Sequence, residues 1–542
     1  MQTSQLQNPS LLYDIIILGA SGFTGKYVVK EALKFLNTPA SPLKNLAIAG
    51  RSHEKLVRTL QWAAHPNPLP PSVSIITADT TDRPSLLSLC RQTKVLLNCV
   101  GPFRIHGEPV VAACASSGCD YLDISGEPEF MERMEAKYHE KAVETGSLVV
   151  SACGFDSIPA EMGFMFNSRQ WVAPAVPNHV DAYVSLESDK RIVGNFGTYE
   201  SAVLGVANMD KLQEFRSSRP KRPRPVPLLP SPPSHEVVMI GGNGHGVGID
   251  NNGSCCVVGS DGADVHGKTM VYAFLYWRIA ELAAVGGRGG WIMVLPVIAS
   301  FDIVQYLTWA LLLIPGPPPS RGPMIEHQEK IGLKAVRLPS ADAVVVRRTL
   351  VTLIENPHGL PGVNESVEHS DKREAFWSSV KPAHFGVKIG SKSLLGIYRI
   401  IGVGMFIGLL GRTSFGRWLL LKFPSFFSLG WFRKKGPSED EVRSASFKMW
   451  FVGYGFSDSS LASQANSKPD MQIITRVMGP EIGYVTTPIV LLQCALILLS
   501  QRESLPKGGA FTPGVVFGPH LEERLQENGI SFDLISKCAL PA

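Results

Sequence analysis

The chain has 542 residues, with 52 Lys or Arg and 47 Asp or Glu, so its formal charge is only +5. This weak charge argues against a dedicated nucleic-acid binder, which needs a dense basic stripe. Because 44% of the residues are hydrophobic, the chain can bury enough apolar surface to exclude disorder as its overall state. Charged residues make up 18%, below the usual value of about 25%. The low charge leaves open whether the protein touches a membrane.

The N-terminal residues 1–12 are polar and contain no Lys or Arg. They lack the features of a secretory signal and the arginines of a transit peptide, so we expect a flexible N-terminus and neither targeting peptide. The nine cysteines form no Cys-x-x-Cys pair and show no metal-ligand spacing. We therefore expect reduced core cysteines in a reducing compartment, and no metal site.

A glycine-rich loop joins the first expected strand to the first expected helix. The apolar run 13–18 predicts a buried parallel strand, and an amphipathic segment follows the loop. In such a unit Gly19 allows the tight turn, Gly22 lets the backbone approach a pyrophosphate, and Gly25 lets helix and strand pack closely. The loop residues predicted to bind a dinucleotide are Gly19, Ala20, Ser21, Gly22, Phe23, Thr24 and Gly25.

The second expected strand, 46–49, ends next to Arg51 and Ser52. A site specific for NAD would place an acid there to bond the ribose 2′-hydroxyl, whereas a guanidinium and a hydroxyl suit a 2′-phosphate. The sequence therefore favours NADP over NAD, although Arg51 could also be a solvated loop charge. A third strand, 73–77, leads to Asp79, which could meet the adenine amino group or cap a helix.

The fourth expected strand starts at Val95 and ends in a loop with Gly101 and Pro102. In an open parallel sheet the ligand lies beyond the carboxyl ends of the strands. Asn98, Val100, Gly101 and Pro102 are therefore predicted to line the ribose–nicotinamide half of the cofactor.

Two further strands of the same kind complete an expected doubly wound α/β sheet. The six strands begin near residues 13, 46, 73, 95, 121 and 148, with helical segments between them.

No catalytic residue can be named from the sequence. Hydride transfer belongs to the cofactor, and the protein supplies orientation and a proton. A Tyr-x-x-x-Lys dyad is not evident, because Tyr138 and Lys141 are separated by only two residues. The weak candidates for the proton donor near the carboxyl edge of the sheet are His106, Asp123, Glu127 and Asp156. Histidine is the side-chain type whose usual pKa is nearest neutral pH, and each of the four residues could instead brace a loop.

Several motifs resemble the eukaryotic, and especially the plant-type, saccharopine dehydrogenase-like oxidoreductases. They are Gly-Ala-Ser-Gly-Phe-Thr-Gly at 19–25, Gly-Pro-Phe-Arg-Ile-His-Gly-Glu-Pro at 101–109, Asp-Tyr-Leu-Asp-Ile-Ser-Gly-Glu at 120–127 and Gly-Phe-Asp-Ser-Ile-Pro-Ala at 154–160. The resemblance resumes at about residue 322 and continues to the end. It implies a Rossmann-type domain, a second α+β domain, and a C-terminal segment that packs back on the first domain.

The resemblance also implies a division of the chain. The expected parts are a flexible start (1–12), the nucleotide domain (13–160), the start of the second domain with a linker (161–224), an atypical insert (225–313), the remainder of the second domain (314–478) and the C-terminal segment (479–542). The insert has no counterpart in the family, and we expect it to be poorly ordered. Intron-derived sequence in a gene model and a lineage-specific insertion both remain open as its origin.

Residues 393–435 form a segment that bears on membrane attachment. The uncharged run 400–411 is too short to span a bilayer. Around it, aromatic and aliphatic residues alternate with Arg and Lys, which is typical of a segment that lies in a membrane interface. A buried dimer or domain interface is the alternative, so a homodimer remains open.

The resemblance implies an activity class without fixing a substrate. Eukaryotic members of the family are associated with membranes and lipid droplets, and related bacterial members are enoyl reductases of lipid and glycolipid synthesis. We expect an NADP-dependent oxidoreductase that reduces a C=C, C=N or C=O bond of a small, lipid-related substrate. The expected place is a cytosol-facing surface of a lipid droplet, the plasma membrane or the mitochondrion. A non-catalytic nucleotide-binding scaffold and a saccharopine dehydrogenase of lysine degradation are the alternatives.

Overall fold

The computed structural model describes residues 11–219, 314–319, 322–464 and 467–540, and the backbone of two short strands. Those strands, β9 (Gly246–Ile249) and β10 (Cys255–Val258), pair antiparallel with each other. Residues 227–313 fall outside the compact unit that holds the rest of the described chain. Apart from β9 and β10, the predicted insert 225–313 lies outside the described residues, and so do residues 1–10, so both interpretations stay predictions.

The first sheet is parallel and has the strand order β17-β6-β5-β4-β1-β2-β3. Its strands are β1 (Tyr13–Leu18), β2 (Leu46–Gly50), β3 (Val73–Thr77), β4 (Thr93–Asn98), β5 (Asp120–Asp123), β6 (Leu148–Val150) and β17 (Gly509–Phe511). The six N-terminal strands confirm the predicted doubly wound sheet. The seventh strand comes from the far end of the chain.

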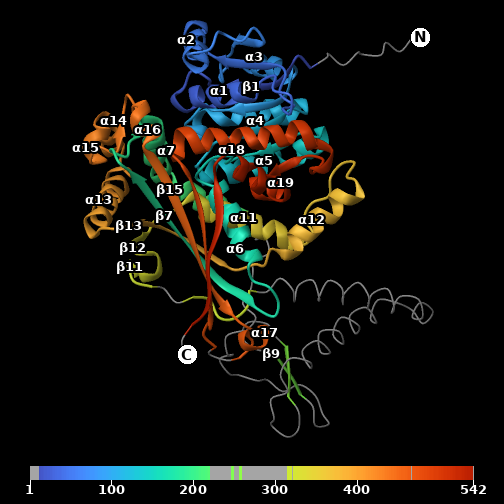
Figure 1. Ribbon diagram of the computed structural model, residues 1–542, viewed down its shortest axis with the longest axis vertical. Helices are drawn as coiled ribbons and strands as arrows, with labels where there is room; N and C mark the ends of the chain where they lie inside the picture. The colour runs from blue at the N-terminus through green and yellow to red at the C-terminus, as the bar shows by residue number, and fades with distance from the viewer. Residues whose placement is uncertain are drawn as a thin grey trace, which may run out of the picture. The chain divides into compact units, whose positions relative to one another are not determined.

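Helices cover both faces of this sheet (Figure 1). They are α1 (Phe23–Phe35), α2 (His53–Ala64), α3 (Arg83–Cys90), α4 (Phe103–Ser117) and α5 (Pro128–Thr145). Ile15 and Ile17 of β1 pack in the cluster that contains α1 and α2 residues, whereas Ile16 and Leu18 pack in the cluster with α3, α4 and α5. Because successive side chains of a strand point to opposite faces, a strand buried on both sides must be apolar throughout.

The C-terminal segment packs back on the first sheet, as predicted. Strand β17 pairs in parallel with β6, and helix α18 (Thr487–Gln501) contacts α1 and β4. Helix α19 (Pro513–Glu527) follows β17. Among the described residues, the helical stretch Ile482–Ser504 is long and apolar enough to cross a membrane, but 78% of its apolar window is buried in the protein. It therefore has the burial of a core helix.

Arg502 connects the C-terminal segment to the first sheet by an ion pair and hydrogen bonds. Its Nε donates to Asp120 Oδ2 at 2.8 Å, and its Nη2 donates to the carbonyl oxygens of Gly146 and Lys507. Burial raises the pKa of the Asp120 carboxyl, and the charge of Arg502 opposes that rise.

Replacing Arg502 with methionine is expected to lower the free energy of unfolding by about 3 kcal/mol at neutral pH, because it leaves a buried carboxylate without its ion-pair partner. The loss should shrink as the pH falls through the pKa of Asp120, where that carboxyl becomes neutral. Chemical denaturation measures both effects. The control is Arg58→Met, which removes an exposed pair with Glu54 and should cost less than about 1 kcal/mol. Equal losses in the two variants would contradict the role given to Arg502.

The second sheet is mixed and has the order β11-β12-β13-β7-β15-β16-β18. Its strands are β7 (Val176–Ser188), β11 (Ile325–Gln328), β12 (Leu333–Arg337), β13 (His384–Ser391), β15 (Ala445–Phe456), β16 (Met471–Pro480) and β18 (Ser531–Ala539). Helix α6 (Ile158–Arg169) lies between the two sheets, and ten of its 12 residues are buried. The inner side chains of both sheets belong to one apolar cluster, so the two halves share a core.

The remaining helices surround the second sheet and the carboxyl edge of the first. They are α7 (Phe196–Ala207), α8 (Met209–Ser218), α11 (Ala341–Glu355), α12 (Val367–Ser379), α13 (Leu394–Leu410), α14 (Ser414–Lys422), α15 (Pro424–Phe427), α16 (Glu439–Arg443) and α17 (Ser459–Ala462). Helices α7, α13, α14 and α15 share a small apolar cluster around Tyr199, Val203, Leu420 and Phe427. Next to it, β8 (Gly194–Asn195) pairs in parallel with β14 (Phe432–Arg433).

Candidate functional site

The glycine loop has the shape that a dinucleotide needs. Gly19 has φ +82°, in the left-handed region that favours glycine, and a Cβ on Gly25 would lie 2.2 Å from the Gly19 carbonyl oxygen. Helix α1 has neither a side-chain cap nor an acid in its first turn. Its first N–H groups are therefore free for an anion. The loop thus fits a pyrophosphate, with Ala20 buried and Ser21, Phe23 and Thr24 half-buried around it.

Arg51, Asp79 and His106 come together at the side of this loop. Arg51 is exposed directly after β2. Asp79 accepts hydrogen bonds from the backbone N–H and the hydroxyl of Thr81, both at 2.9 Å. These bonds, assisted by the charges of Arg51 and His106, lower the pKa of the Asp79 carboxyl. Ser52 caps α2, since its hydroxyl oxygen accepts the N–H of Lys55 at 3.4 Å. An exposed guanidinium at this position suits a 2′-phosphate.

The loop after β4 forms the neighbouring wall. Asn98 is fully buried, where it donates to the Tyr121 hydroxyl and accepts the Val100 N–H, each at 3.0 Å. A Cβ on Gly19 would lie 2.7 Å from Cγ2 of Val100, so the two loops touch. Gly101 is exposed beyond them, and Pro102 is buried. Asn98 therefore shapes the loop, and Val100 lies against the glycine loop.

Two of the four predicted proton-donor candidates hold loops in place. Glu127 accepts the N–H groups of Phe103 and Arg104, at 2.9 and 3.0 Å, and thereby caps α4. Asp123 is fully buried, and its Oδ1 accepts the N–H groups of Ser125 and Ala152. Burial raises the pKa of the Asp123 carboxyl to about 6. Both carboxylates therefore stabilise loops by accepting hydrogen bonds from backbone N–H groups.

The other two candidates are reachable from solvent. His106 is half-buried on α4, and its charge acts on Glu200 of α7, whose pKa burial raises. Asp156 is exposed in the loop after β6. Its Oδ2 lies 2.9 Å from the place that a Cβ on Gly126 would occupy, so this carboxylate lies over the loop after β5.

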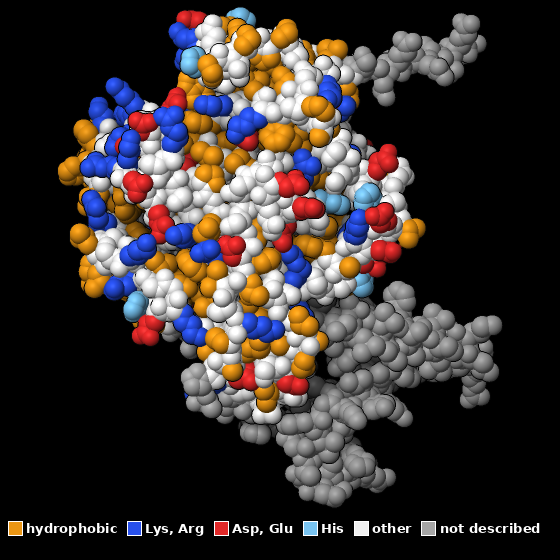
Figure 2. Space-filling model, in the orientation of Figure 1, with side chains coloured by type: hydrophobic (Ala, Val, Ile, Leu, Met, Phe, Trp, Pro, Cys, Tyr) orange, Lys and Arg blue, Asp and Glu red, His pale blue; other side chains and the backbone are white. Residues whose placement is uncertain are grey.

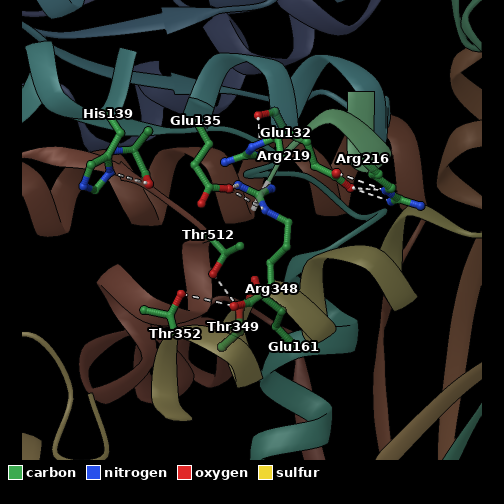
Figure 3. Close-up of polar contacts among 11 residues, drawn as sticks. Glu132, Glu135, His139, Glu161, Arg216, Arg219, Arg348, Thr349, Thr352 and Thr512 are labelled. Atoms are coloured by element: carbon green, nitrogen blue, oxygen red, sulfur yellow. Dashed lines mark hydrogen bonds and ion pairs between the residues drawn. The ribbon is translucent and has the colours of Figure 1, made fainter. Parts of the chain in front are cut away.

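The sequence analysis did not identify Glu161 and Asp342. The fold brings Asp342 within range of the charges of both Asp156 and Glu161. Glu161 on α6 accepts hydrogen bonds from the hydroxyl of Thr349 and the N–H of Gly514, as Figure 3 shows in part. Burial raises the pKa of Glu161 to about 7. The only local signal was an acid inside the apolar run 158–166. We call Asp156, Glu161 and Asp342 the acidic cluster.

A second surface lies on α13, α14, α15 and their loops. Of the 24 large hydrophobic side chains that are exposed in the described part of the chain, 11 lie within residues 394–429. They are Leu394, Leu395, Tyr398, Met405, Phe406, Leu409, Phe415, Trp418, Phe423, Phe426 and Leu429, and we call them the interfacial patch. Patches of this kind mark binding surfaces.

The charged residues within the segment that carries the interfacial patch are all basic. Residues 375–438 contain no Asp or Glu. Arg412, Arg417, Lys422 and the run 433–435 lie among or beside the apolar residues. In Figure 2, hydrophobic and basic side chains gather at the left edge, where Figure 1 places α13, α14 and α15.

Comparison with known proteins agrees with this geometry. Residues 15–150 match the family model described as the saccharopine dehydrogenase NADP binding domain. An Arabidopsis thaliana protein named a mitochondrial saccharopine dehydrogenase-like oxidoreductase is 59% identical, over 98% of this chain and 98% of its own. The chain belongs to the saccharopine dehydrogenase-like oxidoreductase family.

Two other relatives match nearly the whole chain. The human saccharopine dehydrogenase-like oxidoreductase is 30% identical over 97% of each chain. A Caenorhabditis elegans protein named lipid droplet localized protein is 28% identical over 97% of this chain and 99% of its own. The resemblance stated from the motifs is thereby confirmed, and so is a nicotinamide dinucleotide-binding domain at the N-terminus.

Proposed function

We propose that the protein is an NADP-dependent oxidoreductase that reduces a C=C, C=N or C=O bond of a lipid-related substrate at a membrane or lipid-droplet surface. The observation that carries this proposal is the direct connection between the interfacial patch and the nucleotide site. Helix α7 shares an apolar cluster with α14 and α15. On the other side, its Ser201 donates to Glu127, and its Leu204 carbonyl oxygen accepts from Arg104.

This connection supports a substrate that comes from the lipid phase. Glu127 and Arg104 belong to the loops at the carboxyl edge of the sheet, where the reacting end of the cofactor lies in such folds. A protein attached by α13, α14 and α15 therefore holds this edge near the lipid surface. The worm relative's name supports a lipid-droplet surface, whereas the plant relative's name supports a mitochondrial one.

Different residues of the site would bind different parts of the cofactor. The N–H groups at the start of α1 would hold the pyrophosphate, and Arg51 would hold the 2′-phosphate. Val100 and Gly101 would flank the ribose–nicotinamide half. When bound, NADPH supplies a hydride to the substrate.

The deciding experiment measures NADPH oxidation by the full-length protein on vesicles. The substrates are fractions of a lipid extract, with saccharopine and NADP as a separate assay in the reverse direction. Turnover on a lipid fraction alone is the expected result. Tight NADPH binding with no turnover on any substrate would favour the non-catalytic scaffold, and turnover of saccharopine alone would favour lysine degradation.

Arg51 is expected to set the preference for NADP. An Arg51→Asp variant should lose NADPH affinity by about 30-fold, or about 2 kcal/mol, as expected for a hydrogen bond to a charged group, with little change in NADH affinity. Fluorescence titration of both nucleotides checks this. Arg58→Asp makes the same charge change on α2, where Arg58 pairs with Glu54, and should leave the ratio unchanged. An equal loss for NADH and NADPH would remove the role given to Arg51.

A further inference from the structure

The acidic cluster lies between the first sheet and the second half of the fold. Asp156 follows β6, Glu161 lies on α6, and Asp342 lies in the first turn of α11. Ala341 and Val345 of α11 pack against Ala152 and Met131, next to the loop that carries Asp156. Long-range folding thus places a carboxyl from residue 342 beside the carboxyl edge of the nucleotide-binding sheet.

Asp342 has an oxygen with no protein partner. The side chain is buried, with 7% of the residue exposed. Its Oδ2 accepts the Ser340 hydroxyl at 2.7 Å, while Oδ1 has no hydrogen-bond partner in the described part of the chain. A buried carboxylate oxygen rarely stays unsatisfied. A proton on Asp342, or one shared with a nearby acid, would relieve this cost.

Asp156 is the acid that acts most strongly on Asp342. Burial, and next the charge of Asp156, raise the pKa of Asp342 to about 7. Surrounding protein also raises the pKa of Asp156, although this side chain is exposed. Two such groups near each other favour a state with one proton for the pair.

Glu161, whose charge acts on Asp342, and Arg348, whose charge acts on Glu161, are already engaged with other groups. Glu161 bonds Thr349 and Gly514, and it contributes a smaller repulsion to Asp342. Arg348 of α11 pairs with Glu135 of α5 at 2.6 Å (Figure 3). Asp156 is therefore the exposed member of the cluster and the one that a substrate can reach.

We propose that Asp156 and Asp342 share one proton, and that Asp156 exchanges this proton with the substrate atom beside the nicotinamide ring. The inference rests on the proposed function and deepens it. Asp156 is then the catalytic acid, and Asp342 is a positioning residue that keeps the proton on the pair at neutral pH.

The step balances for the reduction of a C=C, C=N or C=O bond. A hydride with two electrons adds to one atom of the double bond, and the O–H bond of Asp156 breaks as its proton bonds to the other atom. NADP⁺, the reduced substrate and an ionised carboxylate pair remain. The pair then takes one proton from water, which Asp156 can do because it is exposed.

The proton can be followed without a substrate, because NADP⁺ carries a positive charge on its nicotinamide ring that NADPH lacks. An ionised pair attracts that charge, and a protonated pair attracts it less. The ratio of NADP⁺ affinity to NADPH affinity of the full-length protein should therefore rise between about pH 6 and 8, by at most about tenfold per pH unit. Calorimetry in two buffers of different ionisation enthalpy should count a proton released on NADP⁺ binding.

Three variants test which carboxyl group carries this proton. Asp156→Asn should leave the affinity ratio flat at every pH. Asp342→Asn removes the repulsion on Asp156, so that group should ionise earlier and the rise should move below about pH 6. Asp371→Asn removes an exposed carboxylate on α12 and should keep the wild-type curve. Circular dichroism shows whether the two cluster variants are folded.

Other outcomes would overturn the inference. A pH-independent ratio in the wild-type protein would show that no shared proton faces the ring. A rise that is lost in Glu161→Gln or His106→Asn, but kept in Asp342→Asn, would place the proton on another group. In both cases the protein still binds NADPH, so the proposed function survives. Failure to bind either nucleotide would overturn both proposals.

Discussion

Replacing Gly25 with alanine is expected to reduce NADPH affinity by at least about 100-fold, which is the largest single-residue effect on cofactor binding. The new Cβ would lie 2.2 Å from the Gly19 carbonyl oxygen and 3.0 Å from its carbonyl carbon. Both atoms belong to the backbone, so α1 must move away from β1. Loss of two hydrogen bonds from its N–H groups to the pyrophosphate, at about 1.5–3 kcal/mol each, accounts for this magnitude.

The control for Gly25 is a helical glycine with space around it. Gly205 in α7 has no atom within 4 Å of an added Cβ, so Gly205→Ala should bind NADPH normally. Fluorescence titration gives the affinities, and circular dichroism shows whether each variant is folded. A folded Gly25→Ala protein with wild-type affinity would rule out this loop as the pyrophosphate site.

Replacing Phe415, Trp418 and Phe426 with serine is expected to weaken binding to lipid vesicles by about 1000-fold. These side chains are 72%, 52% and 73% exposed, and each contributes at least about 1.5 kcal/mol if it enters the acyl region. They lie on or beside α14 and α15, near Arg417 and Lys422. Vesicle flotation and cell fractionation measure the loss.

The matched control removes exposed apolar side chains elsewhere. Val172, Met324 and Val367 are 66%, 76% and 79% exposed and lie outside the interfacial patch. Replacing all three with serine should leave flotation unchanged. Because cations flank the patch, wild-type binding should also be stronger with anionic lipid and weaken as salt increases. Equal flotation of both triple variants would contradict membrane attachment through this surface.

The choice of Phe426 rather than Phe427 for the serine variant rests on the structure. Phe426 and Phe427 are adjacent aromatic residues, yet Phe427 is buried in the cluster with Tyr199 and Leu420, and Phe426 is exposed. The sequence pattern predicted the segment 393–435 as a whole. It could not separate lipid-facing residues from packed ones, because that depends on where α7 lies.

The sequence determined the nucleotide-binding half in most respects. Its strands are apolar runs of local sequence, and its glycine spacing is a requirement of a single strand–loop–helix unit. Arg51 also follows from position alone, since it stands directly after the second strand. The seventh strand, β17, escaped prediction because three residues at 509–511 are too few for a periodic signal. Only pairing with β6 makes them a strand.

Only the tertiary structure determines which residues form the acidic cluster and the interfacial patch. Residues 156 and 342 are distant in the chain, and they lie near each other only because α11 packs against the loop after β6. The same packing gave Asn98, Glu127 and Asp123 partners that hold loops in place. Local sequence specifies strands, turns and helix ends because their forces act between near neighbours. Burial and electrostatic coupling depend on elements that meet only in the folded protein, so the chemistry of the candidate site became visible there.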